Sequence, residues 1–228
     1  MKHLKFLKNF ALAAVAVVLA AGCAKNDDNQ VNTPISTFAV YHVSPDAPKL
    51  QFKLNGTNIN TDSVGYGAYG YYVNAYAGSR EISSYQKDVK KTTITTTLEE
   101  GKIYSVWLAG PWATSEFVVL EDKLVNPALG KAGIRFVNMS VGAPALDLVT
   151  STGTAVVSNK AYKENSDFTS IDGNQNYNFV IRANGSTVDK VLLPSVNLQS
   201  GKIYTIVAKG FYTGTGTTGL SGDVLINY

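Results

Sequence analysis

The sequence is poor in the residue types that reactive sites use. It contains one cysteine, Cys23, and two histidines, of which only His42 lies beyond the N-terminal segment. A lone cysteine cannot form an intrachain disulfide, and no nucleophile-elbow motif accompanies His42. His42 ends an apolar run beside a proline-rich turn, so we expect it to hydrogen-bond that turn rather than act as a general base. The sequence therefore predicts a protein that is not an enzyme.

An excess of charge is also missing once the N-terminal segment is set apart. The chain has 20 Lys and Arg against 17 Asp and Glu. Residues 1–22 hold three lysines, Lys2, Lys5 and Lys8, and no acid, so the rest of the chain is balanced. A nucleic-acid partner requires a basic patch, and none remains. We therefore expect no nucleic acid among the partners.

The chain has no apolar run long enough to span a membrane comfortably. Three lysines precede the apolar residues 10–21, which predicts a signal peptide over residues 1–22. The sequence Leu19-Ala20-Ala21-Gly22-Cys23 resembles a bacterial lipobox. That resemblance implies that Cys23 becomes the first mature residue and carries a lipid that anchors the protein to a membrane. The alternative is a small buried residue beside an ordinary signal peptide.

Residues 23–36 are polar and predict a flexible tether. Asp27 and Asp28 resemble the acidic signal that exports lipoproteins of the Bacteroidetes to the outer leaflet of the outer membrane. The resemblance implies a surface-exposed outer-membrane protein, while a periplasm-facing tether that no receptor reads stays open. The sequence Asp62-Ser63-Val64 resembles the O-glycosylation sequence of the same bacteria, which makes Ser63 a candidate glycosylation site.

Helical periodicity is absent beyond residue 37. Short alternating runs separated by Gly, Asn, Asp and Pro predict strands and turns, and hence an all-β fold. The decapeptide at 101–110 returns at 201–210, each copy beginning Gly-Lys-Ile-Tyr. We therefore predict two tandem immunoglobulin-like or transthyretin-like β-sandwich repeats, over residues 37–126 and 130–228. The repeated strand has large side chains on both faces, which predicts a position with both faces covered or at a contact between the repeats.

Several motifs of the first repeat carry a family resemblance. They are the stretches 42–48, 55–56, 66–72 and 77–80, followed by the Gly-Lys-Ile-Tyr strand. Together they resemble domain-of-unknown-function family 4397. Its members resemble secreted or lipid-anchored β-sandwich modules, often in tandem, with no established catalytic residues. The resemblance implies an architecture and a location and transfers no active site.

Aromatic residues supply the candidate binding site. Trp112 and Tyr212 follow the repeated strand in equivalent turns, and Tyr69, Tyr71 and Tyr76 have no aromatic counterpart in the second repeat. Aromatic rings stack on sugar faces and anchor protein interfaces, so these five are candidate ligand-binding residues. The alternative is that they cap the sandwich ends or fill its core.

No cofactor or metal site is predicted. Oxygen donors gather at 172–176, but they lack the spacing of an EF-hand and indicate a polar turn. The sequence thus predicts a cell-surface lipoprotein with a non-catalytic binding role, for a glycan or a protein ligand. A structural envelope component and a carbohydrate-active enzyme remain as alternatives, because the carboxylate separation of a glycosidase is spatial.

Overall fold

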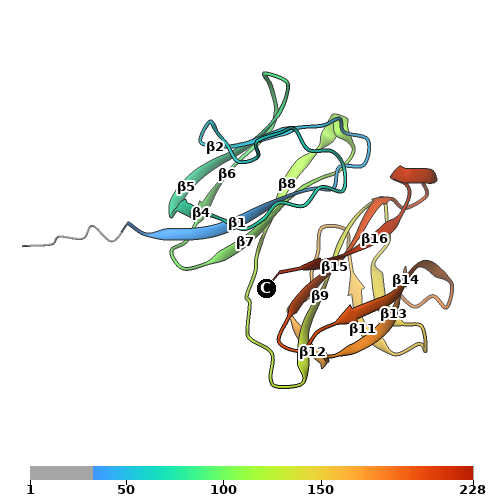
Figure 1. Ribbon diagram of the computed structural model, residues 1–228. Coiled ribbons are helices and arrows are strands. Elements are labelled where there is room, and N and C mark those ends of the chain that lie inside the picture. The colour runs from blue at the N-terminus through green and yellow to red at the C-terminus, as the bar shows by residue number, and fades with distance from the viewer. Residues whose placement is uncertain (1–32, 228) are drawn as a thin grey trace, which may run out of the picture. The chain divides into compact units, whose positions relative to one another are not determined.

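The computed structural model describes residues 33–227, and Thr33–Tyr228 belongs to one compact unit (Figure 1). The predicted signal peptide, the candidate lipidation site Cys23 and most of the predicted tether lie outside the described residues. The described part is built from strands, with two short 3-10 turns, η1 (Trp112–Thr114) and η2 (Gly216–Thr218). None of its helical segments is long and apolar enough to cross a membrane.

The first sandwich consists of two four-stranded sheets that face each other. One sheet has the strand order β4-β1-β7-β8 and the other β3-β2-β5-β6. β1 and β7 pair in parallel, and the other neighbours are antiparallel. The strands are β1 (Ile35–His42), β2 (Gln51–Leu54), β3 (Thr57–Asn58), β4 (Val73–Tyr76), β5 (Gly78–Gln86), β6 (Val89–Leu98), β7 (Ile103–Ala109) and β8 (Glu116–Glu121).

The second sandwich repeats this topology strand for strand. Its sheets have the orders β12-β9-β15-β16 and β11-β10-β13-β14, and β9 and β15 are again the parallel pair. The strands are β9 (Lys131–Val141), β10 (Leu146–Thr150), β11 (Ala155–Lys160), β12 (Thr169–Asp172), β13 (Gln175–Ala183), β14 (Asp189–Leu198), β15 (Ile203–Phe211) and β16 (Ser221–Ile226). The predicted fold of two tandem β-sandwiches is confirmed.

The local sequence explains the hairpin that later shapes the site. Asn55 and Gly56 join β2 to β3 with φ of 46° and 84°, both in the left-handed region. A two-residue turn of this kind matches the twist of the flanking strands, and Asn-Gly is its preferred sequence. The Asn55 side chain also accepts a hydrogen bond from the Glu81 backbone N–H at 2.8 Å, which ties the turn to β5.

The repeated strand β7 is covered on both faces, as its sequence predicts. Tyr104, Val106 and Leu108 lie in the core of the first sandwich. Trp107 and Ala109 point the other way, into a separate apolar cluster. That cluster draws its remaining buried members from both repeats: Ala39, Tyr41, Val43, Val137, Met139 and Val207. A packed apolar contact therefore joins the two sandwiches.

A buried ion pair lies in the same contact. Arg135 Nη1 of β9 is 2.6 Å from Asp122 Oδ1, and the two side chains are 1% and 0% exposed. Ser105 Oγ donates to the same carboxylate oxygen at 2.8 Å, and Arg135 Nε donates to Thr205 Oγ1 at 2.8 Å. Buried charges are tolerated when their remaining hydrogen-bonding capacity is satisfied, and both partners meet that condition here.

The hydroxyl of Tyr72 completes this network. It donates to the Asp122 carboxylate and accepts a hydrogen bond from Asn227 Nδ2 at 2.8 Å. Burial, with the nearby Tyr41 and Asp122, raises the pKa of Tyr72, so the hydroxyl keeps the proton that it donates. Tyr72 thus helps to hold the two repeats together.

Candidate functional site

The tyrosine-rich segment comes closest to β1 at Gly70. The Gly70 N–H donates to the Val40 carbonyl at 2.9 Å, and a Cβ at this position would lie 2.8 Å from the same oxygen. Only glycine allows the segment to approach β1 so closely. On one side of it, the Tyr69 hydroxyl donates to the Asp223 carboxylate of the second sandwich. On the other side, Tyr71 is 91% exposed.

Among the five candidate ligand-binding residues, Tyr69 therefore has a structural role. Its ring lies 5.8 Å from that of Tyr41, centroid to centroid. Burial and the hydrogen bond to Asp223 raise its pKa. The Asp223 carboxylate also pairs with Lys209 Nζ at 3.1 Å. The Tyr69 hydroxyl is thus occupied within the contact between the repeats.

The two repeats differ at one sheet edge. In the first sandwich the edge strand β3 has two residues, and residues 60–63 leave it as an irregular loop. In the second sandwich the equivalent strand β11 has six residues, and its Val157 is part of the core, with Val156 packed against it. The longer strand closes the gap between the two sheets. The short one leaves the same gap open in the first sandwich.

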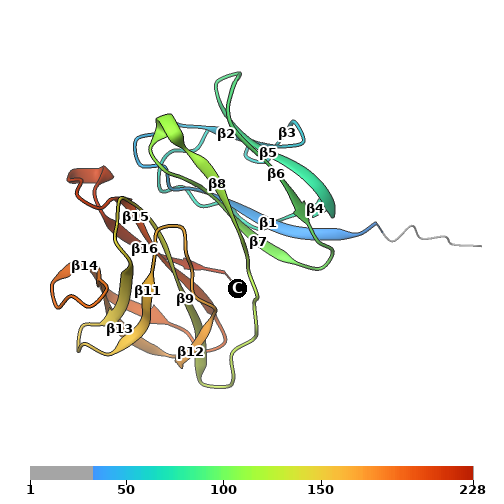
Figure 2. The same cartoon turned by 180° about the vertical axis from the view of Figure 1, so that it is seen from behind.

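Two adjoining cavities occupy this open edge, and we call them together the tyrosine groove. The larger has a volume of about 640 Å³ and lies between β3 and β4, which share one side of the first sandwich (Figure 2). The smaller has a volume of about 320 Å³ and lies beneath the segment 68–71. Ile59 and Val73 line both, so the two are contiguous. Cavities of this size are typical of small-molecule and saccharide sites.

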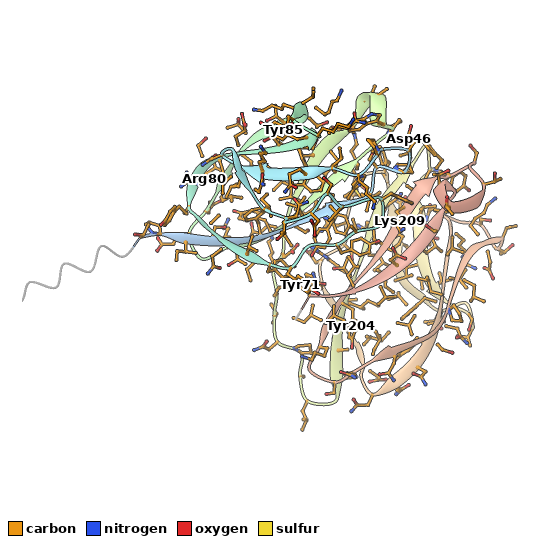
Figure 3. The ribbon with its side chains drawn as sticks, turned by 45° about the horizontal axis from the view of Figure 1, so that its top comes forward. Asp46, Tyr71, Arg80, Tyr85, Tyr204 and Lys209 are labelled. Carbon is orange, nitrogen blue, oxygen red and sulfur yellow. The ribbon has the colours of Figure 1, made fainter. Side chains whose placement is uncertain are left out.

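Exposed tyrosines stand at both parts of the groove. Tyr76, 63% exposed, lines the larger cavity, and Tyr71, 91% exposed, lines the smaller. Arg80 fixes the backbone beneath Tyr76, because its Nε donates to the Tyr76 carbonyl at 2.6 Å and its Nη2 to the Ala77 carbonyl at 2.8 Å. Figure 3 shows Arg80 and Tyr71 on the first sandwich, apart from Tyr85. Two rings are thus presented to solvent on a firmly held backbone.

Neutral polar groups dominate the rest of the polar lining. Asn55, Asn58, Asn60 and Asn74 contribute amides, and none of the acids in the described part of the chain lines either cavity. The Asn60 amide is used internally: Oδ1 accepts from the Phe52 N–H at 2.8 Å, and Nδ2 donates to the Asp62 carbonyl at 2.6 Å. Asn58 is exposed on the rim. The floor is apolar, formed by Phe38, Leu54, Ile59 and Ala75.

Trp112 and Tyr212 lie away from the groove. Both rings are half-buried, and each packs against the core of its own sandwich. The Trp112 backbone N–H donates to Asp46 Oδ1 at 2.7 Å, and Lys190 Nζ lies 5.5 Å from the centroid of the Tyr212 ring. This is the capping arrangement that the sequence left open. The hypothesis that the two rings border a ligand site stays a prediction.

The other candidates have simple surroundings. Ser63 is exposed, in the loop that follows β3, and its glycosylation stays a prediction. Gly173 and Asn174 form a bend between β12 and β13, in which Asn174 Oδ1 accepts a hydrogen bond from the Ser200 N–H at 3.0 Å. Across residues 33–227, no three His, Cys, Asp or Glu side chains gather as metal ligands would.

His42 serves the turn, as its sequence context predicts. The ring is fully buried, with Nε2 3.1 Å from the Pro48 carbonyl oxygen. Burial lowers its pKa. The equivalent Asn138 likewise bonds to backbone, with Nδ2 2.9 Å from the Lys160 carbonyl. A fully buried imidazole cannot contact a substrate, so the ring gives no support to catalysis.

The lowered pKa of His42 predicts a pH dependence of stability. The folded ring resists protonation, so the unfolded chain binds the additional proton as the pH falls below about 6.5. The contribution of the neutral His42 ring to the free energy of unfolding is fully present above about pH 6.5. As the pH falls from there towards the lowered pKa, this contribution decreases by at most about 1.4 kcal/mol per pH unit. Urea unfolding of residues 24–228 between pH 7.5 and pH 5 measures it. The His42→Asn variant should show a shallower decline, and equal declines in both proteins would contradict the assignment.

The sequence identified the rings of the groove but not the groove itself. Tyr71 and Tyr76 stood out because the second repeat lacks aromatics at both positions. The strand registers place Asp172 opposite Lys131 where Tyr76 lies opposite Ile35. The open edge was missed. Its signal was the polar run Asn58-Ile59-Asn60-Thr61 in the first repeat, where the second has the strand-forming Ala155-Val156-Val157-Ser158.

Comparison with known proteins gives one family match. The model of the family described as "Domain of unknown function (DUF4397)" matches residues 36–149, which span the first sandwich and the first two strands of the second. The family resemblance carried by the first-repeat motifs is thereby confirmed. No curated protein matches the sequence.

A solved structure similar to this chain is a family 26 carbohydrate-binding module, CBMbc of Eubacterium rectale Amy13K, in complex with maltoheptaose. It is 13% identical, with a TM-score of 0.26, and the alignment covers 83% of this chain and 95% of that chain.

Proposed function

We propose that this chain, which belongs to the DUF4397 family, binds a glycan in the tyrosine groove. The observation that carries the proposal is the exposure of Tyr71 and Tyr76 beside a cavity lined by amides. Aromatic rings gathered beside a cavity offer a ligand large apolar faces, and these faces suit the C–H faces of sugars. The amides suit sugar hydroxyls, because an amide both donates and accepts.

The lining favours a glycan over a protein ligand. Protein interfaces concentrate binding in desolvated pockets filled by aromatic or arginine anchors of the partner. Here the tyrosines project outwards and the polar lining is amide and hydroxyl, with Arg80 as the charged member. Two of the Arg80 donors are already directed at backbone carbonyls. The groove therefore offers stacking faces and hydroxyl partners rather than an anchor pocket.

A binding measurement with matched variants tests the proposal. The soluble chain of residues 24–228, which retains the whole compact unit, is applied to an array of neutral and acidic polysaccharides. For a bound polysaccharide, Tyr71→Ala and Tyr76→Ala should each weaken binding about tenfold, since an aromatic contact contributes on the order of 1–2 kcal/mol. Both side chains are exposed, so the melting temperature should change little.

Tyr85→Ala is the matched control. Tyr85 belongs to the same sandwich, lies on β5 beneath Lys53 Nζ at 4.4 Å from its ring centroid, and lines neither cavity. Its replacement should leave binding unchanged. Absence of binding to every polysaccharide on the array would overturn the glycan assignment. Equal losses in all three variants would move the site away from the groove.

We further propose that the protein works at the outer membrane, held by a lipid on Cys23 and facing outwards. The lipobox-like sequence and the acidic residues after Cys23 support the proposal. Radiolabelled palmitate should enter the protein in cells and be lost in a Cys23→Ala variant. Protease treatment of intact cells tests the outward face, and protection of residues beyond Cys23 would contradict it.

A further inference from the structure

The two exposed tyrosines are too far apart to contact one sugar ring. Tyr76 lies opposite Ile35 in the pairing of β4 with β1, whereas Gly70 bonds to Val40. Tyr71 therefore stands about four residues along β1 from Tyr76. At the usual rise of a strand, that is on the order of 13 Å. A ligand that contacts both rings must span several sugar residues.

The groove follows the same direction without interruption. The larger cavity reaches from Ile35 and Tyr76 to Val73, and the smaller continues from Val73 to Tyr69 and Tyr71. Its long axis therefore runs along the edge of the sheet, parallel to β1. A linear ligand that follows it passes Tyr76 at the larger cavity and Tyr71 at the smaller.

The charged and polar side chains that line the tyrosine groove disfavour ionised ligands. Among residues 33–227 no acid lines the groove, so these residues offer a cationic glycan no ion pair. Among the described residues its cation is Arg80, whose Nε and Nη2 donate to the Tyr76 and Ala77 carbonyls, so the guanidinium edge that carries these two donors is not available to a carboxylate. The exposed Asn58 and the Asn74 amide instead match hydroxyl groups.

We infer that the tyrosine groove binds a neutral, linear oligosaccharide along its length, with Tyr71 and Tyr76 on different sugar residues. This rests on the proposed glycan-binding function and adds the ligand's charge and minimum length. Binding should therefore strengthen with chain length until both rings are covered and then reach a plateau. A single sugar should bind weakly, because it can cover one ring at most.

Calorimetry with length series of defined saccharides tests the inference. The probes are malto-, cello-, manno- and xylo-oligosaccharides from mono- to heptasaccharide, with oligogalacturonides as the acidic counterpart. In a neutral series that binds, affinity should rise at least tenfold between the disaccharide and the plateau. Tyr71→Ala and Tyr76→Ala should each remove most of that rise, because a longer chain then meets only one ring. Tyr85→Ala should keep the wild-type length dependence.

The outcomes separate this inference from the function it rests on. Monosaccharides that bind as tightly as long chains would overturn the length argument, and binding confined to oligogalacturonides would overturn the neutral charge. Failure of all four neutral series to bind would also overturn it. Any of these results leaves the glycan-binding function standing if the polysaccharide array shows binding that Tyr71→Ala weakens. An array without any bound polysaccharide removes both proposals.

Discussion

Replacing Arg135 with Met is expected to lower the free energy of unfolding by about 3–5 kcal/mol. The substitution keeps the aliphatic volume but leaves the Asp122 carboxylate, 0% exposed, without its counter-ion at 2.6 Å. It also removes the hydrogen bond that Arg135 Nε donates to Thr205 Oγ1 at 2.8 Å. An unpaired buried charge is among the largest single destabilising changes known for proteins. Urea unfolding at pH 7, followed by circular dichroism, measures the loss.

A double-mutant cycle isolates the ion pair from the packing around it. Asp122→Asn alone should also destabilise, and the double variant should lose less than the sum of the two, because no unpaired charge is left. The second repeat has Asn227 at the position equivalent to Asp122, which shows that an amide fits there. Additive losses would mean that the two side chains do not interact in solution.

An exposed pair serves as the control for charge alone. Lys131 pairs with Asp172 on the surface, with side chains 44% and 57% exposed. Such pairs contribute roughly 0–1 kcal/mol, so Lys131→Met should change stability by about 0.5 kcal/mol or less. If Arg135→Met is no more costly than Lys131→Met, the Arg135–Asp122 pair is not buried in the folded protein.

The sequence predicted the architecture because the repeat and the alternation both depend on local residues. Gly101–Gly110 and Gly201–Gly210 identify the same strand twice, and its two apolar faces indicate a strand covered on both sides. Which part of the protein covers the second face of this strand depends on the tertiary structure. The Trp107 face is covered by Met139 and its neighbours of the other repeat, and no periodicity within either repeat states that pairing.

The buried ion pair could have been read from a comparison of the repeats. Arg135 occupies the position of Ala39, and Asp122 that of Asn227. A charge that appears at one copy of a duplicated core position needs a partner, because an unpaired buried charge is not tolerated. The two unmatched charges have opposite sign. That comparison predicts their contact, although it cannot give the distance.

The groove was the least accessible feature from sequence. The candidate tyrosines were named together with other aromatic residues. Tyr69, Tyr71 and Tyr72 are close in sequence, but their surroundings in the structure differ. Tyr69 and Tyr72 bond to acids at the contact between the repeats, whereas Tyr71 faces solvent. The close approach at Gly70 holds this segment against β1. Alternation along a single segment cannot show where a second sandwich lies.

Replacing Trp107 with Ala should have an effect as large as that of Arg135→Met, about 3–5 kcal/mol. Trp107 is fully buried, stacks on Tyr41 with ring centroids 4.4 Å apart, and donates from Nε1 to Ser105 Oγ at 3.0 Å. Its removal leaves a cavity in the contact between the sandwiches and takes away one of the hydrogen bonds that Ser105 Oγ accepts. Trp112→Ala, which truncates a half-buried cap, should cost about 1–2 kcal/mol and is the matched control.

The fluorescence of Trp107 can show whether the two sandwiches unfold in a single transition. In a Trp112→Phe background, Trp107 is the single tryptophan, and its fluorescence follows the contact between the repeats, while circular dichroism follows the strands of both. If the contact stabilises each sandwich, the two signals should change at the same urea concentration, as in a two-state transition. Trp107→Ala should then lower the midpoint of the whole circular-dichroism transition. Loss of the Trp107 signal at a lower urea concentration than the strands would instead mean that the sandwiches separate before they unfold.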